Sequence, residues 1–164
     1  PAPWVFEQFQ DTADKGKYLT TEEVIEICQT AKQYNIEVIP SFDTPAHVGY
    51  MTELYYNTVK ANSNSPIRNF TYKGTDYTLP TQINYREYTG STDTRYDFSV
   101  LDLSNTAVKN FAYAMYNDIA AFFKYYSGSD DFNIGADEVG LKSTITSYTL
   151  PLIHLTNLAC CFSI

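Results

Sequence analysis

Two stretches of the chain follow the same order: an amphipathic helix, a break, and a short β-rich run that ends at an acidic residue. The first helix is predicted to open at Thr20, where Thr20 and Glu23 form a capping-box pattern, and to end near Asn35. Its apolar residues recur at helical spacing and are Val24, Ile27, Cys28, Ala31 and Tyr34. Residues 36–42 are then predicted to form a buried strand, so this stretch is half of a βαβ unit.

The second stretch begins at Ser104, which is predicted to cap a longer helix. The apolar stripe of that helix consists of Val108, Phe111, Ala112, Met115, Ile119, Phe122 and Phe123. Gly128 ends the helix, and residues 132–136 are predicted to form a second short strand. Helices that alternate with short strands in this way predict an α/β fold built on a parallel sheet or barrel.

The rest of the chain has a weaker pattern. A short helix is predicted near 50–59, and residues 61–99 are rich in Asn, Ser, Thr, Gly and Tyr. We interpret 61–99 as a long loop insertion that contains a β-hairpin, within a unit that spans 1–149. The tail 150–164 is apolar and almost uncharged, which is typical of a buried helix start or strand, or of a truncated reading frame.

Composition excludes several classes of function. The formal charge of −8 argues against a nucleic-acid partner, which requires clustered Lys and Arg. No stretch approaches the roughly 18 consecutive apolar residues of a membrane span. Three cysteines are too few for a disulfide framework or a zinc site, and Cys28 is predicted to be a buried thiol. The first residues lack the pattern of a signal peptide. The 15 Tyr and 10 Phe permit stacking on sugar rings, although core and sheet packing is the favoured explanation for most of them.

Candidate catalytic residues follow the two predicted strands. Asp43 and His47 follow the first strand, and Asp137 and Glu138 follow the second. In parallel α/β folds, ligands bind beyond the carboxyl ends of the strands. Two adjacent carboxylates repel each other, so one holds its proton more tightly and can act as an acid.

Each of these residues also has a purely structural interpretation. Asp137 and Glu138 can form a solvated cap at the start of a helix, Asp43 an Asx turn, and His47 an ordinary hydrogen bond in a loop. A metal site made of all four residues is chemically conceivable, but their spacing is not that of a known ligand set. We therefore predict no metal site.

The same residues carry a family resemblance. Residues 18–24, 31–40 and 43–47 resemble one block of glycoside hydrolase family 20. Residues 101–104 with the helix that follows, and then 132–138, resemble the next block in the same order. This family contains the β-N-acetylhexosaminidases and the lacto-N-biosidases. The resemblance implies an O-glycosidase whose substrate is a glycan with a terminal β-linked N-acetylhexosamine.

The resemblance also implies a mechanism. Members of the family retain anomeric configuration by substrate-assisted catalysis, in which the 2-acetamido oxygen of the substrate attacks the anomeric carbon. The residue that matches Glu138 is the acid and then the base, and the residue that matches Asp137 orients the acetamido group. The histidine that matches His47 is expected behind Glu138, with Asp43 nearby. No metal or organic cofactor is implied.

The matched region, roughly 17–139, resembles about the third and fourth βα units of a (β/α)8 TIM barrel, and a full barrel takes about 250 residues. We therefore expect this chain to be part of a longer, secreted or extracytoplasmic protein and to turn over poorly alone. Many members have Gly where Ala46 and Ala136 stand, and Glu where Ser41 stands.

Three other functions stay open at this point. A non-catalytic carbohydrate-binding or interaction module could share the fold. Release of a disaccharide, of the lacto-N-biosidase type, would differ from release of a single N-acetylhexosamine only in the subsites that bind the sugar. A metal-dependent hydrolase could use Asp43 and His47.

Overall fold

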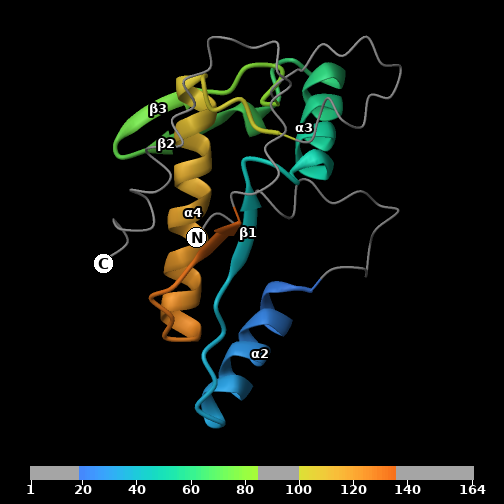
Figure 1. The fold of residues 1–164 in the computed structure, drawn as a ribbon. Helices are drawn as coiled ribbons and strands as arrows, with labels where there is room; N and C mark the ends of the chain where they lie inside the picture. Colours follow the sequence, from blue (N-terminus) through green and yellow to red (C-terminus); the bar gives the residue numbers. More distant parts are fainter. Residues whose placement is uncertain (1–18, 85–99, 136–164) are drawn as a thin grey trace, which may run out of the picture.

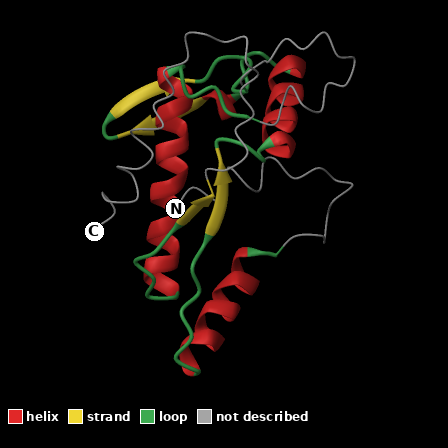
Figure 2. Ribbon diagram, in the orientation of Figure 1, coloured by secondary structure: helices red, strands yellow, loops and turns green. Residues whose placement is uncertain are grey.

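A computed structural model describes residues 19–84 and 100–135 (Figures 1 and 2). The helices are α2 (Thr21–Gln33), α3 (Gly49–Ala61), a 3-10 helix (Pro66–Arg68) and α4 (Thr106–Tyr126). The strands are β1 (Ser41–Thr44), β2 (Asn69–Tyr72), β3 (Thr75–Thr78) and β4 (Asn133–Gly135). The tail 150–164 and the boundary predicted before it lie outside the described residues.

The strands β1 and β4 pair in parallel, although 88 residues separate the end of one from the start of the other. Ser41 is opposite Asn133 and Thr44 is opposite Gly135, with an irregularity between these two pairs. Figure 1 shows both arrows running in the same direction beside α4. The predicted α/β arrangement with parallel strands is therefore confirmed, and the carboxyl ends of the two strands share one edge.

Helix α2 begins and ends at the predicted signals. The Thr20 hydroxyl accepts from the Glu23 amide at 3.2 Å, and the Glu23 carboxylate accepts from the Thr20 amide at 2.7 Å. At the other end Asn35 adopts a φ of 57°, and the amide of Ile36 donates to the Ala31 carbonyl, which is a Schellman motif. Cys28 is fully buried as predicted, and burial raises the pKa of its thiol.

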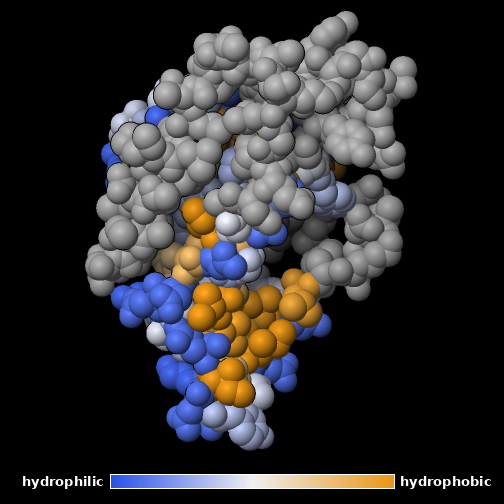
Figure 3. All heavy atoms as spheres, in the orientation of Figure 1, coloured by the Kyte–Doolittle hydropathy of each residue, from blue (hydrophilic) through white to orange (hydrophobic). Residues whose placement is uncertain are grey.

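The predicted strand 36–42 is wrong in its position. The strand begins at Ser41 and ends at Thr44, so Asp43 lies inside β1 rather than in the loop after it. Ile36 and Ile39 are 58% and 49% exposed. Among the described residues β4 is the strand that pairs with β1, and its first hydrogen bond is from the Asn133 amide to the Pro40 carbonyl, so the residues before Pro40 have no strand beside them. Figure 3 shows an apolar surface in the region of α2 and the segment that follows it.

Helix α4 supplies one side of the core. Asn105 rather than Ser104 is its N-cap, because the Ser104 hydroxyl is bonded to Asp102 while the Asn105 side chain accepts from the Ala107 and Val108 amides. The predicted stripe is buried in its first half, at Val108, Phe111, Ala112 and Met115. Its second half is only half-buried, at Ile119, Phe122 and Phe123.

The segment predicted as an insertion contains the expected β-hairpin, β2–β3, closed by a turn in which Lys73 and Gly74 have positive φ. It also contributes to the core: Leu79 and Ile83 are fully buried against α4 and α3, and the ring of Phe70 meets that of Phe111 edge-on at 5.6 Å. Helix α3 and the hairpin lie toward the carboxyl end of β1 (Figure 1). None of the helices in 19–84 and 100–135 has both the length and the apolar character needed to span a bilayer.

Tyr55 of α3 should make stability depend on pH in the alkaline range. Its side chain is fully buried, its hydroxyl donates to the Pro80 carbonyl at 2.7 Å, and burial raises its pKa to about 12 despite the opposing effect of Arg68. The protonated Tyr55 hydroxyl therefore contributes to the free energy of unfolding. This contribution is complete below pH 10.0 and is lost as the pH rises toward 12, because the phenol ionises at lower pH in the unfolded chain than in the folded one.

Between these two pH values, the free energy of unfolding of the wild-type chain should fall by about 2–3 kcal/mol more than that of Tyr55→Phe, which has no hydroxyl to ionise. Urea unfolding at a series of alkaline pH values measures the fall in both chains. Tyr125→Phe, at a side chain that is 77% exposed, is the matched control. Equal falls in the wild-type and Tyr55→Phe chains would contradict the assignment.

Candidate active site

The shared edge of β1 and β4 places Asp43 against Gly135. A Cβ atom built on Gly135 would lie 3.0 Å from Asp43 Cγ and 3.2 Å from Asp43 Cα, so the Asp43 carboxylate occupies the space that a side chain at 135 would need. Side chains alternate along β1, and Asp43 is exposed while its neighbour Thr44 is buried. Two residues that are 92 positions apart are thus brought into contact at the end of the sheet.

Strand β4 ends at this contact. Gly135 has a φ of 66°, a left-handed conformation that favours glycine, and its amide donates to the Asn133 side chain at 2.9 Å. Asp137 and Glu138 follow two and three residues later and lie outside the described residues. The described part of the chain therefore ends at Gly135, just before the predicted carboxylates.

The loop after β1 carries His47. The Thr44–Pro45 peptide bond is cis, and Ala46 and Val48 are buried on either side of His47. His47 itself is exposed and has a φ of 62°, a left-handed conformation that is uncommon for residues other than glycine. The Leu101 amide donates to the Pro45 carbonyl at 2.8 Å, so the chain that returns from the insertion supports this loop.

A buried hydroxyl pair lies beneath the site. Thr44 and Tyr116 of α4 share a short hydrogen bond, and the two side chains are 1% and 2% exposed. Burial raises the pKa of the Tyr116 hydroxyl, the bond to Thr44 lowers it in part, and Tyr113 adds to the increase. The Tyr116 hydroxyl is therefore protonated at neutral pH. Tyr116 follows Ala112 by four residues on the buried stripe, but its pairing with Thr44 was not predicted from the sequence.

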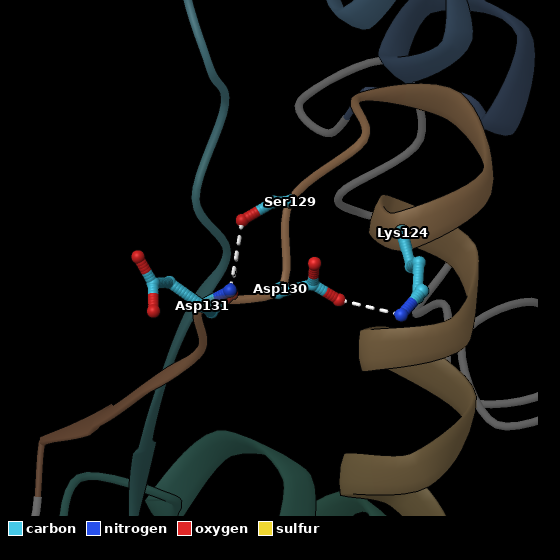
Figure 4. Close-up of polar contacts among 4 residues, drawn as sticks. All are labelled: Lys124, Ser129, Asp130 and Asp131. Carbon is cyan, nitrogen blue, oxygen red and sulfur yellow. Dashed lines mark hydrogen bonds and ion pairs between the residues drawn. The ribbon is translucent and has the colours of Figure 1, made fainter. Parts of the chain in front are cut away.

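The loop between α4 and β4 holds two further aspartates at the opposite end of the strand (Figure 4). Lys124 pairs with Asp130 at 2.6 Å, and the Asp131 amide donates to the Ser129 hydroxyl at 3.1 Å. The Lys124–Asp130 pair is exposed and contributes little stability. Both aspartates precede β4 and therefore stand away from the edge that holds Asp43.

The described part of the chain offers no metal centre. Within residues 19–84 and 100–135, no three His, Cys, Asp or Glu side chains are close enough together to hold an ion. Asp43 and His47 come from β1 and the loop that follows it, and the other two residues of the metal hypothesis are outside these ranges. What the described edge does present is the Asp43 carboxylate against Gly135, with His47 in the loop that follows β1.

One comparison with known proteins identifies a family. The family described as "Glycosyl hydrolase family 20, catalytic domain" matches residues 5–150. Searches of characterised proteins and of solved structures returned no match. The family's catalytic domain implies a TIM barrel, glycoside hydrolysis and glycan substrates. With a match that covers most of its 164 residues, the chain belongs to glycosyl hydrolase family 20.

Proposed function

We propose that the protein to which this chain belongs releases terminal β-linked N-acetylhexosamine residues from glycans, by a retaining and substrate-assisted mechanism. The observation that carries the proposal is the contact of Asp43 with Gly135 at the shared carboxyl edge of β1 and β4. Because ligands of parallel α/β folds bind at this edge, the contact is where a substrate would meet both strands.

Chain connectivity supports a role for Asp137 and Glu138 at this edge. Asp137 and Glu138 follow Gly135 by only two and three residues in the sequence. Glu138 is proposed to protonate the leaving oxygen and then to activate water. Asp137 is proposed to accept from the acetamido N–H of the substrate and to stabilise the positive charge that develops there.

Asp43 and His47 are proposed to support this pair rather than to react. The Asp43 carboxylate adds negative charge where the chain leaves β4, and this charge favours the cation-like sugar of the transition state. His47 sits in the loop that follows β1, between the buried residues Ala46 and Val48, and its imidazole is proposed to bond a carboxylate of the site. Neither role requires a metal or an organic cofactor.

We further propose that β1 and β4 are about the third and fourth strands of the barrel. The apolar surface near α2, with exposed Ile36 and Ile39, is of the kind that neighbouring barrel units cover. A complete barrel takes about 250 residues, so we expect the 164-residue chain alone to turn over poorly or not at all. Full activity of the purified chain would overturn this part of the proposal.

The test is hydrolysis of nitrophenyl β-N-acetylglucosaminide, β-N-acetylgalactosaminide and lacto-N-bioside by this chain and by the longer protein. We expect the longer protein to cleave at least one of them, and the preferred substrate distinguishes monosaccharide from disaccharide release. Activity that survives a chelator excludes a metal-dependent hydrolase. A folded longer protein that cleaves none of the three, but binds N-acetylhexosamine, would replace the hydrolase with a binding module.

A further inference from the structure

Tyr116 contacts the last residue of one strand of the proposed site and the residue directly before the other. Its hydroxyl is bonded to Thr44, the last residue of β1, and its ring lies 5.8 Å from the ring of Phe132, the residue directly before β4. The ring of Tyr113, one turn earlier on α4, packs against it edge-on at 6.5 Å. One side chain of α4 therefore touches the end of β1 and the start of β4.

The bond from Tyr116 to Thr44 acts where the two strands meet. Thr44 is the β1 residue opposite Gly135, and it directly follows Asp43. Both hydroxyls are buried, so neither can exchange its partner for bulk water without the structure opening. Any rotation or slip of the end of β1 that moves Asp43 from Gly135 must also break this bond.

We propose that Tyr116 is a positioning residue, which holds the end of β1 against β4 so that Asp43 meets the chain where it leaves Gly135. The expected effect of Tyr116 on catalysis rests on the proposed hydrolase function, but its effect on the ends of the two strands does not. The ring of Tyr116 packs the helix on Phe132, directly before β4, while its hydroxyl ties the end of β1 to the same helix. These two contributions can be separated by a substitution that removes only the hydroxyl.

The test compares Tyr116→Phe with Tyr55→Phe in the full 164-residue chain. Tyr55 is the matched control, since it is also a fully buried tyrosine with a bonded hydroxyl, but its partner is Pro80 in the insertion. Amide hydrogen exchange is followed in peptides that cover 41–47 and 132–140. We expect Tyr116→Phe, but not Tyr55→Phe, to speed exchange in both peptides by roughly tenfold through local opening.

A third variant tests whether the two hydroxyls act as a pair. Thr44→Val should reproduce the effect of Tyr116→Phe, and the double variant should exchange no faster than either single one, because the same bond is lost in all three. Exchange at wild-type rates in both peptides of Tyr116→Phe would overturn the inference. An equal acceleration in every peptide of the chain would also overturn it, since that result describes only a loss of global stability.

Activity gives an independent second measurement. In the longer protein, Tyr116→Phe should lower kcat by roughly tenfold and leave KM within about twofold, because the hydroxyl orders the catalytic groups without contacting the sugar. An unchanged kcat beside altered exchange at the strand ends would overturn the catalytic part of the inference. If the wild-type longer protein hydrolyses no glycoside, the proposed function fails, while the exchange result still decides the structural role of Tyr116.

Discussion

Gly135→Ala is expected to lower the free energy of unfolding of the chain by about 2–4 kcal/mol and to displace Asp43 from the end of β4. Gly135 has a φ of 66°, a conformation that costs alanine more than glycine. The new Cβ would also lie 3.2 Å from Asp43 Cα, which is backbone of the paired strand and cannot rotate away as a side chain end can. The substitution therefore carries both a conformational cost and a steric one.

Gly128→Ala separates the two penalties. Gly128 also has a positive φ, of 82°, but a Cβ built there has no atom within 4 Å. Its substitution should therefore show only the conformational cost, about 1–2 kcal/mol, in urea unfolding. Gly135→Ala should exceed that cost and should also speed amide exchange at Asp43. Equal destabilisation by both substitutions would show that Asp43 does not press on Gly135.

Local signals explain which boundaries the sequence predicted correctly. The capping box at Thr20 and the left-handed turn at Asn35 involve residues within five positions of each other, so the sequence alone specifies the ends of α2. The cap of α4 was missed by one residue because Ser104 and Asn105 are both good caps. Asp102 decides between them by accepting from the Ser104 hydroxyl, which leaves Asn105 to bond the first amides of the helix.

The position of β1 depends on a partner that is distant in the sequence. Ile36 and Ile39 have the branched side chains that favour strands, but hydrogen bonding to β4 begins only at Pro40. The strand is consequently shorter and later than its propensity predicts. The same dependence hides the contact of Asp43 with Gly135, which follows from the register of two strands and from the missing side chain at 135.

The candidate site was proposed from strand ends and acidic residues, which are visible in sequence. Asp43 lies inside β1 and His47 in the loop that follows it, and the roles of these two residues and of Asp137 and Glu138 stay predictions. The supporting hydroxyl pair of Thr44 and Tyr116 was not predicted, because only the folded structure shows that these buried groups, 72 positions apart, face each other.

Glu138→Gln in the longer protein is expected to lower kcat/KM for an N-acetylglucosamine disaccharide by about 10²–10⁴-fold. Glutamine keeps the shape of the side chain but has no acidic proton to give to the leaving oxygen. A nitrophenyl glycoside is expected to lose less, because nitrophenolate leaves readily without being protonated. The difference between the two substrates, measured by initial rates on each, identifies Glu138 as the acid rather than as a residue that only binds sugar.

Two matched variants complete this experiment. Asp131→Asn neutralises a carboxylate at the opposite end of β4 and should leave the rates on both substrates unchanged. Asp137→Asn should lower the rates on both substrates to a similar extent, because the acetamido group must be oriented whatever the leaving group is. An equal loss of rate on the two substrates for Glu138→Gln would reject the role of Glu138 as acid. A missing proton donor lowers the rate most for the substrate with the poorer leaving group.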